Sequence, residues 1–141
     1  MRIQQDIATL LLRVALASGF LSAVASRLNF WGKQSSGWQN FLSYTEQVNS
    51  FVPKNFIPAI AVASTFLELV FGILLLIGYQ TSYVAYASAL LTLLFAIAMT
   101  YSFGIKEPLD YSVFAFSASA FLLATFHHYK WSIDQFLNQL N

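Results

Sequence analysis

The chain has 141 residues, of which 57% are hydrophobic and only 9% are charged, and it contains no cysteine. The formal net charge of +1 gives no support for a nucleic-acid partner, and no cluster of Lys and Arg indicates a polybasic lipid-binding segment. The lack of cysteine excludes disulfides, thiol redox chemistry and Cys-ligated metal centres within this chain.

Long apolar stretches dominate the sequence. They run roughly over residues 7–28, 57–77, 83–103 and 109–126, each near the length that crosses about 30 Å of hydrocarbon. The pattern predicts an all-α integral membrane protein, a four-helix transmembrane bundle that forms a single domain over residues 1–141. The lipid bilayer is therefore an expected partner. An even number of spans, four, would place both termini on the same side of the membrane.

The first stretch is interrupted by Arg13 and is rich in small residues, with Ser18, Ser22 and Ser26 one helical turn apart. Such a stripe allows helices to pack closely. A secretory signal peptide that ends near the small residues 23–25 is the alternative. Arg13 opposes it, because a signal peptide keeps this region apolar, and the other stretches predict a membrane protein in either case.

The longest connection, residues 29–55, is rich in Trp, Asn, Gln, Ser and Gly. Its apolar residues nevertheless recur at helical spacing, which predicts a short amphipathic helix at the interface or over one mouth of the bundle. Pro53 is expected to end this helix, and Pro58 suits the first turn of the next span. The apolar positions are Trp38, Phe41, Leu42, Thr45, Val48 and Phe51 or Val52.

The second stretch has two contrasting faces. Its small and polar face is expected to point into the bundle, while its bulky face meets lipid. The first face carries Ala61, Ser64, Thr65, Glu68, Gly72 and Leu75, and the second carries Phe66, Val70, Ile73 and Leu74.

Glu68 is an acid in an otherwise uncharged run, and charges at such a depth usually have a partner. We expect that partner to be Arg13, because the two residues lie roughly 10 and 14 Å from the same membrane face at the helical rise per residue. The ion pair could simply hold the helices together. It could also form a pocket with Thr65 and Gly72 for a lipid headgroup, a quinone carbonyl or a proton relay. Alternatively, Arg13 could extend toward Asp6 and the headgroups.

The second half of the chain contains two short connections. Residues 78–82 form a polar turn that predicts an antiparallel hairpin, and residues 104–108 combine a helix-stopping Gly with a Pro. The polar segment 127–141 predicts a short interfacial helix. His127 and His128 point in different directions on a helix and have no further ligands nearby in sequence, so no metal site is predicted.

A second group of residues is expected at the bundle mouth opposite Arg13 and Glu68. Asp110 and Tyr111 follow a proline, which favours a helix-capping role for Asp110. The functional alternative places Trp38, Lys106, Asp110 and Tyr111 around that mouth. Basic residues are spread almost evenly between the two sides, so the sequence does not fix the orientation in the membrane.

Four segments together resemble the DoxX family of small four-span membrane proteins. Residues 11–20 are similar to that family's arginine followed by small residues, and residues 67–78 to its glutamate, glycine and leucine-rich ending. Residues 104–112 and 132–134 resemble segments of its bacterial members. The resemblance implies a four-helix bundle in a bacterial cytoplasmic membrane that associates with redox complexes.

Members or relatives of that family are described as a thiosulfate:quinone oxidoreductase subunit, a maturation factor for a periplasmic dehydrogenase, and a receptor-assembly chaperone. Two hypotheses follow from the resemblance. The first is a redox-associated subunit whose Arg13 and Glu68 line a pocket for a quinone or an amphipathic lipid. The second is a noncatalytic assembly factor or scaffold that docks a protein partner, in a redox or maturation complex, through residues 38–52. The sequence assigns no catalytic residue and leaves open whether the protein is an enzyme.

Overall fold

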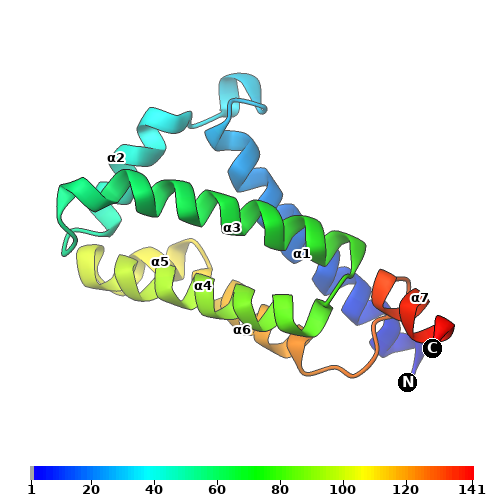
Figure 1. The fold of residues 1–141 in the computed structure, drawn as a ribbon. Helices are drawn as coiled ribbons and strands as arrows, with labels where there is room; N and C mark the ends of the chain where they lie inside the picture. Colours follow the sequence, from blue (N-terminus) through cyan, green and yellow to red (C-terminus); the bar gives the residue numbers. More distant parts are fainter. Residues whose placement is uncertain (1) are drawn as a thin grey trace.

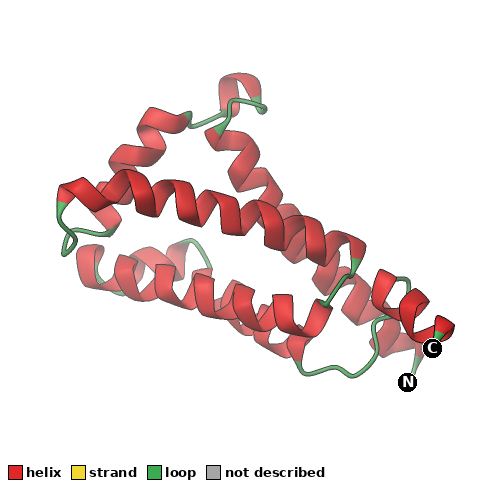
Figure 2. Ribbon diagram, viewed as in Figure 1, coloured by secondary structure: helices red, strands yellow, loops and turns green. Residues whose placement is uncertain are grey.

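The computed structural model describes residues 2–141, and all regular secondary structure in that range is helical (Figures 1 and 2). The predicted all-α class and transmembrane bundle are confirmed. The elements are α1 (Ile3–Arg27), η1 (Gly32–Gln34), α2 (Trp38–Val48), η2 (Lys54–Phe56), α3 (Ile57–Ile77), α4 (Thr81–Phe103), α5 (Lys106–Asp110), α6 (Val113–Ala124) and α7 (Ile133–Leu140).

Two helix pairs build the bundle. Helix α1 packs along α3 and helix α4 packs along α6, while weaker contacts between α3 and α4 and between α1 and α6 hold the pairs together. The turn after α3 makes α3 and α4 antiparallel neighbours, and both chain ends lie at the end of the bundle where α7 sits (Figure 1). Helix α2 lies at the other end, between α1 and the start of α3.

Small side chains allow the helices to approach closely. A Cβ at Gly72 of α3 would lie 2.9 Å from the Leu21 side chain of α1, so this glycine sits where the two helices touch. Phe66 and Ile73, on the opposite side of α3, are exposed. The predicted inward face is therefore confirmed, in keeping with the packing of helices in lipid, where small residues face neighbours. The predicted outward face is confirmed for Phe66 and Ile73, whereas Leu74 packs against the core. The alanines with no exposed surface are Ala17, Ala61, Ala85, Ala96 and Ala120.

Three helical segments are long and apolar enough to cross a membrane: Ile3–Arg27, Lys54–Ile77 and Thr81–Phe103. The predicted fourth stretch, 109–126, is wrong as a continuous helix. Helix α5 ends at Asp110 and Ser112 adopts a φ of +57°, so the chain turns before α6 begins. The remaining helix has 12 residues, a length of about 18 Å that falls short of the hydrocarbon thickness.

Both predicted short helices are present. Helix α2 buries Thr45 and Val48 and ends at Val48, before the expected end at Pro53. Helix α7 begins at Ser132, whose hydroxyl accepts a hydrogen bond from the Gln135 backbone N–H at 3.1 Å. The capping serine explains why α7 starts there.

The C-terminal segment is joined to the turn between α3 and α4. Asp134 accepts hydrogen bonds from the backbone N–H groups of Gln80 and Thr81, at 2.7 and 2.8 Å, and so caps the start of α4. Its own backbone N–H donates to the Gly78 carbonyl at 2.9 Å. Gly78 has a φ of +74°, and a Cβ there would lie 2.6 Å from Arg13 Nη2 and would also collide with Ser132. This turn therefore requires glycine for two reasons, its backbone conformation and its contacts.

We expect Gly78→Ala to lower the free energy of unfolding by about 3 kcal/mol, because it adds overpacking to the strain of a left-handed residue. Gly32→Ala is the control. Gly32 also has a positive φ, of +60°, but a Cβ there would meet nothing within 4 Å, so only the backbone strain of about 1 kcal/mol is expected. Reversible unfolding in mixed detergent micelles measures both. Equal effects of the two variants would contradict the packing role of Gly78.

Candidate functional site

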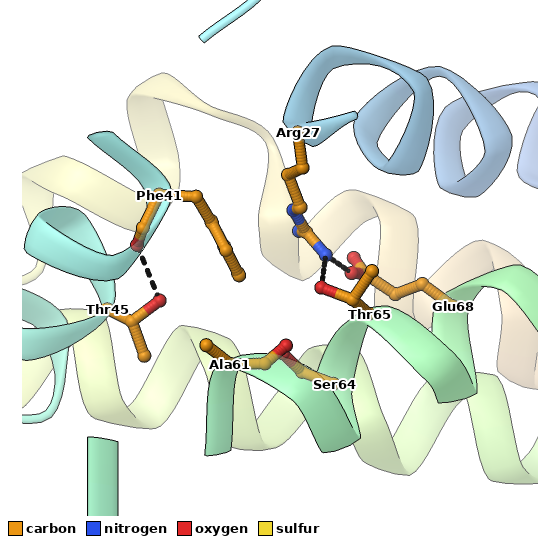
Figure 3. A network of polar contacts seen from close by, with 7 residues as sticks. All are labelled: Arg27, Phe41, Thr45, Ala61, Ser64, Thr65 and Glu68. Atoms are coloured by element: carbon orange, nitrogen blue, oxygen red, sulfur yellow. Dashed lines mark hydrogen bonds and ion pairs between the residues drawn. The ribbon is translucent and has the colours of Figure 1, made fainter. Parts of the chain in front are cut away.

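An ion pair between Arg27 and Glu68 lies inside the bundle (Figure 3). Arg27 is the last residue of α1 and Glu68 lies midway along α3, and the two residues are 9% and 5% exposed. The Arg27 Nη1 group donates to a Glu68 carboxylate oxygen and also to Thr65 Oγ1, the latter at 2.9 Å. Each buried charge thus has an opposite charge as its neighbour, which offsets the cost of removing it from water.

The ion pair also anchors helix α2. The Arg27 guanidinium carbon lies 3.7 Å from the centroid of the Phe41 ring, a cation–π contact with the inner face of α2 (Figure 3). Further along, the hydroxyls of Ser50 and Ser102 are hydrogen-bonded at 2.8 Å. The segment outside the long helices is therefore fixed to α1, α3 and α4.

The predicted pairing of Arg13 with Glu68 is wrong. Arg13 is 1% exposed, and its hydrogen bonds place it beside the end of α3 and the C-terminal segment. Its Nε and Nη2 groups donate to the carbonyls of Leu75 and Leu76, both at 3.1 Å. Its Nη1 group donates to the carbonyls of Lys130 and Trp131, both at 3.2 Å.

The contacts of Arg13 are explained by helix geometry. The last carbonyls of a helix have no partner within the helix, and the helix dipole places partial negative charge there. A planar guanidinium with five N–H donors can satisfy several such carbonyls at once. Arg13 thus has backbone carbonyls of α3 and of the C-terminal segment as its partners, in place of an acidic side chain. The alternative contact with Asp6 is also not formed, since Asp6 lies 3.6 Å from Lys130 Nζ instead.

The other predicted site residues are divided between the two ends. Thr65 accepts a hydrogen bond from Arg27, whereas Gly72 lies at the contact with α1. At the α2 end, Lys106 Nζ pairs with Asp110 at 2.5 Å along α5. Asp110 thus does not cap the following helix, although its residue pattern predicts that role. Tyr111 is exposed, and Trp38 packs against Phe41 with ring centroids 5.6 Å apart.

Tyr44 of α2 lies outside the long spans and stacks on Phe103, with ring centroids 6.2 Å apart. Burial raises the pKa of Tyr44 above its ordinary value. Within residues 2–141, no three His, Cys, Asp or Glu side chains gather as a metal site would require. His127 and His128 lie beside an open groove of about 420 Å³ next to α7.

Sequence reasoning missed Arg27 as the partner of Glu68, although a signal was present. Arg27 lies inside the first apolar stretch, at the end that enters the connection to α3. Glu68 lies midway along its span, so an arginine at the opposite membrane face can also reach it by extending inward from a helix end. Helix α1 also crosses α3 obliquely, which brings its last turn over Thr65 and Glu68 (Figures 1 and 3).

These features define a membrane-embedded helical bundle whose buried charges are satisfied within the protein. The chain matches the family described as methylamine utilisation protein MauE over residues 5–110, and it belongs to that family. The resemblance to the DoxX family is therefore wrong, and the quinone pocket loses the support that it drew from that resemblance. No curated protein and no solved structure matches the chain.

We expect the single variants Arg27→Leu and Glu68→Leu each to lower the free energy of unfolding by about 3 to 5 kcal/mol, because each leaves one buried charge without its partner. The double variant should be much closer to the wild type, since it removes both charges. Unfolding in mixed micelles measures all three.

The exposed pair of Glu46 and Lys54, 3.3 Å apart, is the matched control. Replacing either residue with alanine should change stability by less than about 1 kcal/mol. Additive losses in the Arg27 and Glu68 double variant would show that the two residues do not depend on each other.

We expect Arg13→Lys to release the C-terminal segment, because an ammonium group cannot replace a fork of donors to four carbonyls. The local stability of residues 127–141 should fall by about 3 kcal/mol, the value of one or two hydrogen bonds to a charged group. Hydrogen exchange of that peptide measures the effect. The exposed Arg2, changed to Lys, is the control, and equal exchange in both variants would contradict the role of Arg13.

Proposed function

We propose that this protein is a noncatalytic membrane accessory factor that assists the assembly or maturation of a protein partner in a methylamine-utilisation system. Its family is described by that system. The proposal also places the protein in the cytoplasmic membrane of a bacterium. The partner-binding region in this proposal is the segment between α1 and α3.

The observation that carries this proposal is the way in which α2 is held. Its inner face is fixed by the contact of Phe41 with Arg27 and by burial of Thr45 and Val48. Its outer face is polar and exposed, and consists of Gln39, Asn40, Ser43, Glu46 and Gln47. A rigid polar helix outside the long spans presents a surface to a partner without first having to be ordered, which favours binding.

The buried polar residues support a structural rather than a catalytic role. Arg13 is occupied by backbone carbonyls, and Glu68 is paired with Arg27. These contacts hold α1, α3 and the C-terminal segment in fixed positions. Fixing helix positions is a well-attested use of buried polar groups, so the bundle serves as a support for α2 in this proposal.

A photocrosslinking residue tests the proposal in intact membranes. Placed at Gln39 or Gln47, on the outer face of α2, it should capture a component of the methylamine-utilisation system in a discrete adduct that mass spectrometry identifies. Gln139 is the matched control, since it is an exposed glutamine on α7 at the other end of the bundle. The proposal fails if no adduct forms at α2 or if the same adducts form at both ends.

A further inference from the structure

A cavity of about 140 Å³ lies beneath α2, where α2, α3 and α4 meet. The polar side chains in its lining are Arg27, Tyr44, Thr45, Asn49, Ser64 and Glu68. The rest of the lining is largely apolar and aromatic, and includes Phe95 and Met99 of α4. Its volume is close to that of a cavity that holds one benzene molecule, about 150 Å³.

Arg27 has hydrogen-bond donors to spare at this cavity. Its Nη1 group is used by Glu68 and Thr65, while Nε and Nη2 have no acceptor anywhere in residues 2–141. The side chain is nevertheless nine-tenths buried. Figure 3 shows the guanidinium between α2 and α3, beside the Phe41 ring. A ligand that supplies an oxygen acceptor to these donors would add charge-assisted hydrogen bonds, which are stronger than bonds between neutral groups.

The charges in the lining indicate which ligand fits. Arg27 and Glu68 together are neutral, so an anion would compete with Glu68 for Arg27 and a cation would compete with Arg27 for Glu68. A neutral oxygen acceptor has no such conflict. Most of the cavity wall is apolar, so a ligand that combines an oxygen acceptor with apolar carbons matches this wall better than water alone does.

We propose that this cavity binds the neutral oxygen-bearing head of a single-chain lipid of the acylglycerol type, with a carbonyl or hydroxyl oxygen accepting from Arg27. The first carbons of the chain lie against Phe95 and Met99. Tyr44, which is 36% exposed, stands at the rim, and the chain leaves past it toward the bilayer. This site uses the inner face of α2 and is independent of the partner surface on its outer face.

The test uses the full chain in lipid nanodiscs with a photoreactive monoacylglycerol that carries a diazirine near its head. We expect saturable labelling of the cavity lining on α2 and α4, located by mass spectrometry. Unlabelled monoacylglycerol should compete, whereas an alkane of the same chain length should not, because it lacks the oxygen acceptor.

Variants separate the cavity from the general lipid surface. Met99→Trp should fill the cavity and lower saturable labelling about ten-fold, the effect of losing roughly one good contact. Val113→Phe makes the same test at another lining residue if Met99→Trp fails to fold, as judged by its melting temperature. Leu90→Trp is the control, because Leu90 lies on the exposed side of the same helix, and its labelling should equal that of the wild type.

Arg27→Lys tests the head contact, since it keeps the charge opposite Glu68 but removes the spare guanidinium donors. Labelling should again fall about ten-fold. Three outcomes would overturn the proposal: labelling that does not saturate, which means that the probe reacts only with the general lipid surface; labelling that the alkane suppresses equally well; and labelling that Met99→Trp and Val113→Phe leave unchanged. None of these outcomes bears on crosslinking at Gln39 or Gln47.

Discussion

A charge inside an apolar bundle must be satisfied by the protein, because the surrounding hydrocarbon offers no hydrogen bonds. Arg13 and Arg27 meet this requirement in different ways. Arg13 uses backbone carbonyls at the end of α3 and in the C-terminal segment, whereas Arg27 uses the carboxylate of Glu68. The rest of the structure depends on these two solutions, since each one joins segments that are distant in the sequence.

The two arginines stabilise opposite ends of one bundle. At the end that holds the termini, Arg13 and Asp134 bind the helix ends on either side of the turn at Gly78, so that the last residues become part of the fold. At the other end, Arg27 lies between α3 and α2 and joins an interfacial helix to the membrane-embedded core. Between the ends, small side chains allow close packing, as in other bundles in lipid.

The same geometry relates the two proposals. Helix α2 has an inner face that covers a small cavity and an outer face that is free for a protein partner. A ligand in the cavity would contact the inner face of α2. Because these contacts form only when α2 is packed against α3 and α4, the ligand would stabilise the packed position of α2. The surface offered to the partner would then be more rigid, although neither proposal requires the other.

The sequence by itself determined the helical membrane class, the buried and exposed faces of α3, the glycine turn at Gly78 and the presence of α2. These features follow from local composition and from the 3.6-residue period, so they can be predicted from a single chain. The break at Ser112 was missed, because a left-handed serine is set by its surroundings rather than by its own preference. Likewise, the family was assigned wrongly from four short segments, whereas the family match extends over residues 5–110.

Only the tertiary structure decided which arginine meets Glu68. That pairing depends on the tilt of α1 across α3, and no local pattern in the sequence encodes a helix tilt. The carbonyl partners of Arg13 lie 62 to 118 residues away and carry no side-chain signature, because every residue has the same backbone oxygen. The candidate site could therefore be predicted as a buried charge in need of a partner, while the identity of that partner was fixed by packing.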